Sequence, residues 1–282
     1  MDARKLTAPP KLLAPAGSLE AVSAALAAGA DAVYVGVRGL SRGGSRAGMG
    51  LPEIGRASKA CARAGAEIQA AVNAVPAASE LPAFLSAVTR LRAAGVGTVV
   101  LNDPGVIALV RGEVPGIRIC ASVGLSTLNA EDARFLRDLG ADAVVLPTAV
   151  RLDEVPAIKA IGGLAVEVFL LCRAEVILHG KCALPGYALP GNAPEGRPGL
   201  VRAGATASAK RSGRCHLVCR ALPLRQETHS IEDELADWIR AGVDAFKVQG
   251  RELGPEKLGD LVSRLRGRLD AAIADVRREG TP

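Results

Sequence analysis

Aromatic residues are scarce in this 282-residue chain, amounting to 2% of it as four Phe, two Tyr and one Trp. So few rings leave little surface on which nucleic-acid bases could stack. No run approaches the roughly 20 apolar residues that a membrane-spanning helix needs, and the amino-terminal residues lack the apolar stretch of a secretory signal. Hydrophobic residues nevertheless make up 49% of the chain, which excludes a disordered protein. The sequence therefore predicts a globular, cytoplasmic protein without a membrane span.

Acidic residues are nearly absent from residues 172–225. This stretch holds nine Lys or Arg residues and only two acids, Glu175 and Glu195, so it carries +7 where the whole chain carries +6. The positive charge is therefore a local feature, and it indicates an anionic ligand.

Four of the six cysteines fall in the same stretch, and they are Cys172, Cys182, Cys215 and Cys219. In a reducing compartment, clustered cysteines are more often metal ligands or redox groups than disulfides. Four thiolates suit either an iron–sulfur cluster or structural zinc, and neighbouring His179 and His216 are possible replacement ligands. We expect these four cysteines to bind a metal centre, whereas Cys61 and Cys120 lie in apolar stretches and are expected in the core.

One pattern recurs along the chain: an Ala- and Leu-rich helical stretch, a glycine, and then a short run rich in β-branched residues. It occurs at residues 28–35, 64–68, 94–100, 139–145 and 241–248. The glycines are typical of helix C-caps, and apolar runs with little alternation are typical of parallel strands buried on both faces. We expect strands at residues 11–16, 32–37, 67–73, 98–103, 118–122, 142–147, 164–171 and 245–249. Helices are expected at residues 18–28, 51–64, 80–94, 130–139, 153–161, 231–241 and 255–279, with His229 and Ser230 opening the sixth helix and Ser230 as its N-cap.

Eight such strands predict a TIM-type (β/α)8 barrel. An open doubly wound sheet is the alternative, but Gly36-Val37-Arg38-Gly39 lacks the glycine spacing of a dinucleotide fingerprint. We interpret residues 1–282 as a single barrel domain with an amino-terminal tail at 1–10. Residues 172–226 form an inserted, irregular loop after the seventh strand, far longer than an ordinary connection and therefore expected to bind the metal and the anion.

Loops that follow barrel strands open on the carboxyl-terminal face, where active sites lie. The strand ends offer polar groups that we expect to face this mouth: Asn73, Asp103, Ser122, Glu167 and Arg251. Arg251 is the strongest candidate, because a guanidinium after the eighth strand can hold a carboxylate at two points. The competing interpretation pairs Arg251 with Glu252 or Asp244. Predicted substrate contacts are Arg251, Asn73 and Arg211 of the basic stretch.

Several segments, taken together and in order, resemble peptidase family U32, the collagenase-like proteins. They are residues 11–21 and 27–36, which are similar to the family's opening, and residues 102–106, 121–124, 175–182, 211–220 and 241–251. The resemblance covers about residues 11–256. It implies a [4Fe–4S] protein that hydroxylates without molecular oxygen and takes the oxygen from prephenate, a dicarboxylate that would suit the basic mouth.

The chain departs from the family pattern after Cys182, where no second cysteine follows closely. The resemblance therefore assigns Cys182, Cys215 and Cys219 as cluster ligands and leaves Cys172 to supply the fourth thiolate. The few aromatic residues, and the absence of the carboxyl-terminal extension of longer RNA-modifying members, favour the ubiquinone-biosynthesis type represented by the UbiU and UbiV proteins.

The leading hypothesis is thus an iron–sulfur enzyme of quinone synthesis that acts on a quinone precursor with a prephenate-like anion, beside a second, related family member as a heterodimer. The alternatives are an enzyme that hydroxylates tRNA or rRNA, a collagenase-like peptidase, and a non-catalytic partner subunit. A peptidase is disfavoured because the sequence contains neither a glycine-framed serine elbow nor a His-Glu-x-x-His helix.

Overall fold

The computed structural model describes residues 8–41, 48–173 and 227–279. Within them, eight parallel strands pair side by side, and pairing of β6 with β7 closes the sheet into a barrel. The strands are β1 (Lys11–Ala16), β2 (Ala32–Gly36), β3 (Glu67–Ala71), β4 (Thr98–Leu101), β5 (Arg118–Ala121), β6 (Ala143–Val145), β7 (Ala165–Arg173) and β9 (Ala245–Val248). The predicted TIM-type (β/α)8 barrel is confirmed.

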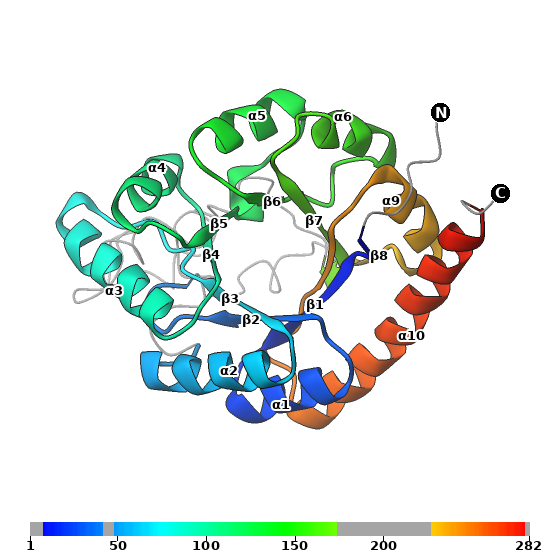
Figure 1. The fold of residues 1–282 in the computed structure, drawn as a ribbon, viewed down its shortest axis with the longest axis horizontal. Coiled ribbons are helices and arrows are strands. Elements are labelled where there is room, and N and C mark those ends of the chain that lie inside the picture. The colour runs from blue at the N-terminus through cyan, green and yellow to red at the C-terminus, as the bar shows by residue number, and fades with distance from the viewer. Residues whose placement is uncertain (1–7, 42–47, 174–226, 280–282) are drawn as a thin grey trace, which may run out of the picture.

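Helices surround the barrel as a ring (Figure 1). They are α1 (Leu19–Ala27), α2 (Leu51–Arg63), α3 (Leu81–Ala93), α4 (Pro104–Glu113), α5 (Ala130–Asp138), α6 (Val155–Lys159), α9 (Leu235–Ala241) and α10 (Pro255–Glu279). Short 3-10 turns stand at Ala78–Glu80, Val123–Leu125, Leu152–Glu154 and Glu232–Glu234. None of the helices in the described ranges is long and apolar enough to cross a membrane.

Local sequence signals explain most of the helix ends. The five glycines of the repeated pattern all have positive φ values, as expected for C-caps: Gly29, Gly65, Gly95, Gly140 and Gly242. Helix α4 was not expected from the sequence, although Asp103 and Pro104 mark its start. The Asp103 side chain accepts a hydrogen bond from the Val106 N–H at 3.1 Å, and Pro104 occupies the first turn.

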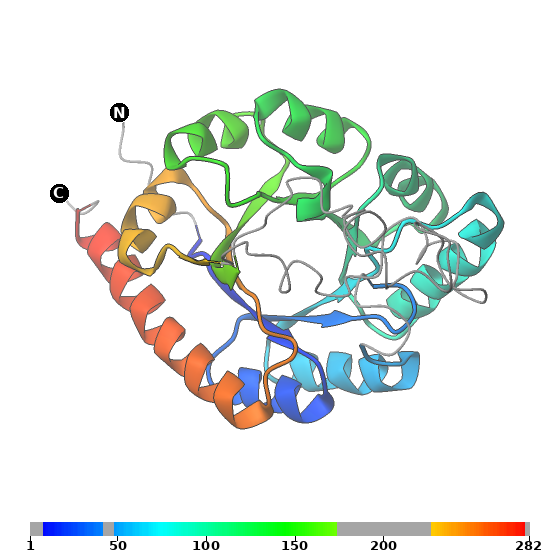
Figure 2. The ribbon, with the colours of Figure 1, turned by 180° about the vertical axis from the view of Figure 1, so that it is seen from behind.

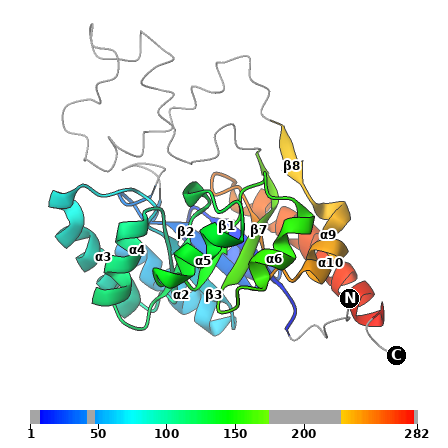
Figure 3. The same cartoon turned by 90° about the horizontal axis from the view of Figure 1, so that it is seen from above.

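The segment after residue 226 differs from the expectation. Thr228–Ser230 forms a short strand, β8, antiparallel to β7, with Cys172 opposite His229. His229 therefore lies in a strand and does not open a helix. The Ser230 hydroxyl accepts from the Glu232 N–H two residues on, and α9 begins only at Leu235. Strand β8 projects beyond the barrel at its carboxyl end (Figure 3).

Two apolar layers build the core. The larger layer lies between the sheet and the helices, and the smaller one fills the barrel with residues such as Val100, Cys120 and Phe169. The barrel interior also holds charge: the Lys247 ammonium lies 3.1 Å from the Glu167 carboxylate, and the two residues are only 5% and 3% exposed. Although burial favours the neutral amine, the adjacent Glu167 raises the pKa of Lys247.

The same pair of interactions recurs at three strand starts at the amino-terminal end of the barrel. Three aspartates at strand starts, Asp31, Asp142 and Asp244, each accept a hydrogen bond from the backbone N–H of a neighbouring strand at 2.6–2.7 Å. Each also pairs with a basic side chain, which is Arg266, Arg111 or Lys159 respectively. The aspartate that follows the glycine in three of the five repeats therefore fastens one strand to the next. The view from behind shows the same ring of strands from its other face (Figure 2).

Candidate active site at the carboxyl end of the barrel

The described chain ends at Arg173 of β7 and resumes at Glu227, just before β8. Arg173 pairs with Thr228, so the two ends of the intervening segment meet at the carboxyl-terminal mouth. Four predicted site residues, Cys182, Arg211, Cys215 and Cys219, lie outside the described residues, as do His179 and His216. Cys172, Asn73 and Arg251 lie within them.

Arg251 follows β9, and two glycines make room for it. A β-carbon at position 36 would lie 2.3 Å from the Arg251 Nη1 atom, and one at position 17 would lie 2.2 Å from its carbonyl oxygen. At position 17 the clash would be with the backbone, and at position 36 the guanidinium would have to move away. Glycines at both positions therefore allow Arg251 to lie against the ends of β1 and β2. Both glycines belong to the segments that open the chain, and their close packing on Arg251 gives a physical reason for their presence there.

No acidic side chain in the described ranges forms an ion pair with Arg251. Asp244 pairs instead with Lys159 at the opposite end of β9, and Glu252 makes no ion pair with Arg251. The interpretation of Arg251 as a strand-end salt bridge to Asp244 is therefore wrong. Its guanidinium is partly exposed and lies 5.9 Å from the centre of the Tyr34 ring. Arg251 thus presents a charged, planar group at the mouth, suited to a carboxylate or a phosphate.

Tyr34 connects the mouth to the barrel interior. Its hydroxyl donates a hydrogen bond to the Val248 carbonyl oxygen at 2.9 Å, and the Lys247 ammonium lies 4.7 Å from its ring centre. Burial raises the pKa of Tyr34, while Arg251 and Lys247 oppose the rise. Cys172, a predicted cluster ligand, lies close enough to Tyr34 that a thiolate at Cys172 would raise the pKa of Tyr34 further. A bulge between Phe169 and Leu171 shifts the register of β7 just before Cys172.

A second polar group, which was not predicted from the sequence, lies at the mouth beyond the ends of β4 and β5. Asn102 is 1% exposed and Thr127 is 0% exposed, and the Asn102 amide and the Thr127 hydroxyl have no hydrogen-bond partner among the described residues. Asn102 packs against Gly124, where a β-carbon would lie 2.2 Å from its Oδ1 atom. Buried polar groups are rarely left unsatisfied, so both are candidates for contact with water or a ligand. Asn102 directly follows the buried strand β4, which was the available signal for it, whereas Thr127 lies beyond the 3-10 turn that follows β5 and had no such signal.

The other expected mouth residues divide into three groups. Ser122 is buried after β5 and its hydroxyl lies 3.5 Å from the Gly124 N–H, while Asn73 lies half-buried after β3. Asp103 caps α4. Glu167 was expected to face the mouth, and this was wrong, because its side chain points into the barrel.

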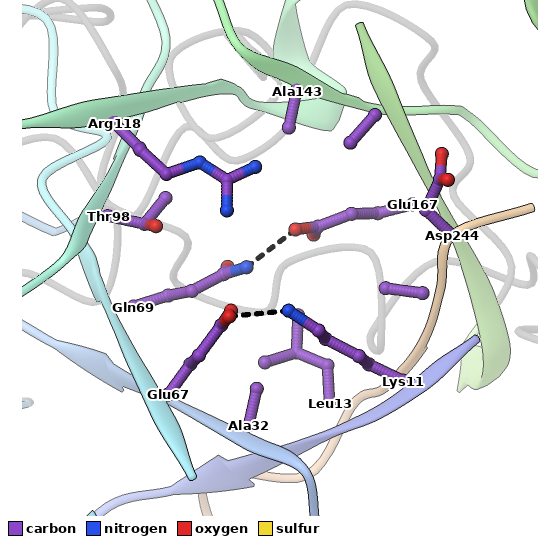
Figure 4. A pocket seen from close by; sticks show the side chains of 12 residues that line it. Lys11, Leu13, Ala32, Glu67, Gln69, Thr98, Arg118, Ala143, Glu167 and Asp244 are labelled. Atoms are coloured by element: carbon purple, nitrogen blue, oxygen red, sulfur yellow. Dashed lines mark hydrogen bonds and ion pairs between the residues drawn. The ribbon is translucent and has the colours of Figure 1, made fainter. Parts of the chain in front are cut away.

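Glu167 belongs to a hollow at the amino-terminal end of the barrel. The Gln69 amide donates to its carboxylate at 2.6 Å, and Lys11 pairs with Glu67 beside them. Figure 4 shows these side chains converging on the hollow together with Arg118. Because β7 is parallel to its barrel neighbours, Glu167, near the start of β7, can reach only the amino-terminal half of the interior.

Cys61 and Cys120 are 1% and 0% exposed, as expected for core residues. Burial raises the pKa of Cys61 to about 11, and burial with the nearby Glu167 raises the pKa of Cys120. Neither thiol is therefore a thiolate at neutral pH. Across the described ranges, no group of three or more His, Cys, Asp or Glu side chains could hold a metal ion. The proposed cluster thus depends on Cys172 together with cysteines outside those ranges.

The fold, together with an arginine that has no acidic partner among the described residues, defines a (β/α)8-barrel protein with a candidate anion site at the carboxyl ends of its strands. Residues 17–281 match Peptidase family U32, and the chain belongs to this family. The resemblance seen in the opening residues is therefore confirmed.

Two curated relatives modify RNA according to their names. The 23S rRNA 5-hydroxycytidine C2501 synthase of Escherichia coli (strain K12) is 29% identical over 284 residues, which cover 94% of this chain and 40% of that protein. The tRNA hydroxylation protein P1 of Bacillus subtilis (strain 168) is 24% identical over 294 residues, covering 96% of this chain and 66% of that protein. This chain therefore spans about two fifths of the first relative and two thirds of the second.

A solved structure, that of the U32 peptidase Mk0906, shares the fold. Its TM-score is 0.55 at 13% sequence identity, over 89% of this chain and 97% of that chain. At this identity the likeness concerns the fold alone.

Proposed function

We propose that this protein takes part in the oxygen-independent hydroxylation of RNA, with the reaction centre at the carboxyl-terminal mouth of the barrel. The observation that carries the proposal is Arg251, which packs against Gly36 at the mouth without an acidic partner among the described residues, in a chain whose relatives are named for rRNA and tRNA modification. These relatives support the RNA alternative better than the quinone precursor that the scarce aromatic residues favoured.

In the proposed site, Arg251 would hold one carboxylate of an anionic oxygen donor. Prephenate is the donor that the resemblance implies, and its two carboxylates suit a guanidinium that lies against Gly36 without a competing acid. Asn102 and Thr127, which are buried beyond the ends of β4 and β5, would orient polar groups of the substrate through atoms that lack partners in the described residues. These side chains bind and orient, whereas the redox step requires a cofactor.

A [4Fe–4S] cluster held by Cys172, Cys182, Cys215 and Cys219 would supply electron transfer when bound. Cys172 fits this role in position, because it is the penultimate residue of β7, close in sequence to the segment that contains the other three cysteines. Zinc is the alternative occupant for four thiolates, and its role there would be structural.

Metal analysis of anaerobically purified protein separates the two occupants. We expect about one four-iron cluster per chain, with matching sulfide, and loss of most of it on replacement of Cys182, Cys215 or Cys219 by Ala. The matched control is Cys61→Ala, which removes a buried core thiol and should retain the iron. Full iron retention in the Cys215→Ala, Cys219→Ala double variant would contradict the assignment, and stoichiometric zinc without sulfide would make the site structural.

The function itself is tested by mass spectrometry of nucleosides from rRNA and tRNA of cells that lack this protein. One hydroxylated nucleoside should disappear and return with the wild-type chain, but not with the Cys215→Ala variant. Unchanged nucleosides together with a lowered quinone content would reinstate the quinone hypothesis.

A peptidase is the second candidate, supported by one register of the sheet. Cys172 and His229 are opposite residues of the neighbouring strands β7 and β8, and a cysteine-type peptidase needs a thiol beside a base. Gelatin cleavage by the wild-type chain that is lost in Cys172→Ser, with the hydroxylated nucleosides unchanged in cells lacking the protein, would favour this candidate over RNA hydroxylation.

A further inference from the structure

The outer face of α2 carries a row of basic side chains that differs from the other basic surfaces of the molecule. Arg56, Lys59 and Arg63 are spaced three and four residues apart, so they project from one side of the helix. The opposite side of α2 is buried against the barrel through Ile54, Ala57, Ser58 and Cys61. All three basic side chains are exposed and point to solvent.

Arg90 of α3 extends this row. Ala94, one turn after Arg90, faces α2, since it lies 3.8 Å from where a β-carbon of Gly55 would be. Arg90 is therefore on the flank of α3 that adjoins α2, and it too is exposed. We call Arg56, Lys59, Arg63 and Arg90 the α2 ridge.

None of the four ridge residues forms an ion pair or a side-chain hydrogen bond within the described ranges. The acid of α2 and the acid just before α3 are otherwise engaged: Glu53 accepts from the Gly50 N–H and pairs with Arg38, and Glu80 accepts from the Ala77 N–H. The ridge therefore has four positive charges without local compensation. Such a surface raises the local potential and attracts an extended anion.

Basic residues on the other side of the barrel are arranged differently. On α9 and α10, five arginines each pair with an acidic side chain: Arg240, Arg264, Arg266, Arg268 and Arg278. Figure 1 places these helices away from α3, with α1 between α2 and α10. Among the described residues, a row of neighbouring basic side chains without acidic partners thus lies on α2 and α3, whereas most arginines of α9 and α10 are paired.

The ridge is joined to the proposed reaction centre by the chain itself. Helix α2 starts just after Met49, whose N–H donates to the carbonyl oxygen of Gly36, the residue that cradles Arg251. From this start the helix runs down the outside of the barrel. Arg56 and Arg63 are about 10 Å apart along the helix axis, so the row is long enough to contact more than one phosphate of a nucleic-acid strand.

We propose that the α2 ridge binds the phosphate backbone of the RNA whose base enters the mouth. The inference rests on the proposed function and adds to it the surface along which the substrate is held. Contacts to phosphates need no aromatic residues, so the 2% aromatic content does not disfavour this mode of binding.

The test measures binding of bulk transfer RNA as a function of salt, because backbone contacts are independent of sequence. The ridge variant is Arg56→Gln, Lys59→Gln, Arg63→Gln. Its matched control, Arg264→Gln, Arg268→Gln, Arg278→Gln, removes the same charge from the paired flank. The ridge variant should bind about tenfold or more weakly at low salt, and the slope of log affinity against log salt should become shallower by about two to three. The control should keep the wild-type slope.

Equal slopes for the wild-type chain and the ridge variant would overturn the ridge while leaving RNA hydroxylation standing. An equal loss in the ridge and control variants would also overturn it, since net charge alone would then explain the binding. If the wild-type chain does not bind RNA at all, both the ridge and the proposed function fail. Thermal unfolding of both variants, which alter only exposed or partly exposed side chains, checks that the fold is retained.

Discussion

The two ends of the barrel differ in how their charged side chains are partnered. At the amino-terminal end, Asp31, Asp142 and Asp244 each bind a backbone N–H and a basic side chain, and Lys11 pairs with Glu67. At the carboxyl-terminal end, Arg251 has no acidic partner among the described residues. Charges that are mutually satisfied stabilise a fold, whereas an unpaired charge held in a fixed place is available to a ligand. The pairing at the amino-terminal end stabilises the fold, and the carboxyl-terminal end is where we propose that the ligand binds.

The largest effect expected from this comparison is on the buried pair inside the barrel. Lys247→Met leaves the Glu167 carboxylate buried without its partner and should lower the free energy of unfolding by about 3–5 kcal/mol. Because the pKa of Lys247 is raised, the pair's contribution is complete below about pH 10.4 and is lost as the pH rises through the higher folded value. Urea unfolding at several pH values measures both effects.

A double variant sharpens this result. Glu167→Gln with Lys247→Met removes both charges and should be less destabilised than Lys247→Met alone, because no charge is then left unpaired. If the single and double variants unfold at the same urea concentration, the ion pair does not account for the loss.

Arg251→Lys is expected to weaken ligand binding without lowering stability, the opposite of Lys247→Met. It keeps the charge but loses the planar two-point contact, so prephenate binding should weaken by roughly 1.5–3 kcal/mol while the unfolding temperature stays the same. Calorimetric titration and thermal unfolding of the same sample give both quantities. Unchanged affinity in Arg251→Lys, with a lowered unfolding temperature in Arg251→Ala, would remove Arg251 from the site.

Gly36→Ala tests the cradle without altering Arg251. The new β-carbon would lie 2.3 Å from Nη1, so the guanidinium must move, and ligand binding should weaken by about 1–2 kcal/mol. Combined with Arg251→Lys, the loss should be less than additive, since both changes act on one contact. Gly55→Ala is the control, because a β-carbon there meets only Ala94 at 3.8 Å. Additive losses would show that Gly36 and Arg251 act independently.

The smallest effect is expected at the rim of the amino-terminal end. Lys11 and Glu67 have side chains that are 43% and 45% exposed, so solvent screens their attraction. Lys11→Gln should change the free energy of unfolding by less than about 1 kcal/mol and leave prephenate binding unaltered. A change in binding would break the division between the two ends.

Most of the fold could be predicted from the sequence, because its signals are local. The repeated glycines locate the helix ends, Ser18 caps α1 by accepting from the Ala21 N–H, and α10 has the expected bounds. Helix α4 could have been found from Asp103 and Pro104. Strand β8 could not, since it has three residues and forms only by pairing with β7.

The candidate site was less accessible to prediction, because it depends on contacts between distant parts of the chain. Arg251 could be singled out by its place after the eighth strand, but its cradle joins it to Gly17 and Gly36, more than 200 positions away. Glu167 was expected at the mouth because the sequence alone does not show how far along β7 this residue lies. Asn102 was missed because a lone polar residue after a strand usually only ends it.

The most direct test of the division between the two ends joins function and stability in one comparison. Hydroxylated nucleosides and thermal unfolding are measured for Arg251→Lys and for Lys247→Met. Arg251→Lys should lose the nucleoside and keep the wild-type unfolding temperature, while Lys247→Met should unfold at a clearly lower temperature. Full modification by Arg251→Lys would contradict the placement of the reaction centre at the carboxyl-terminal mouth.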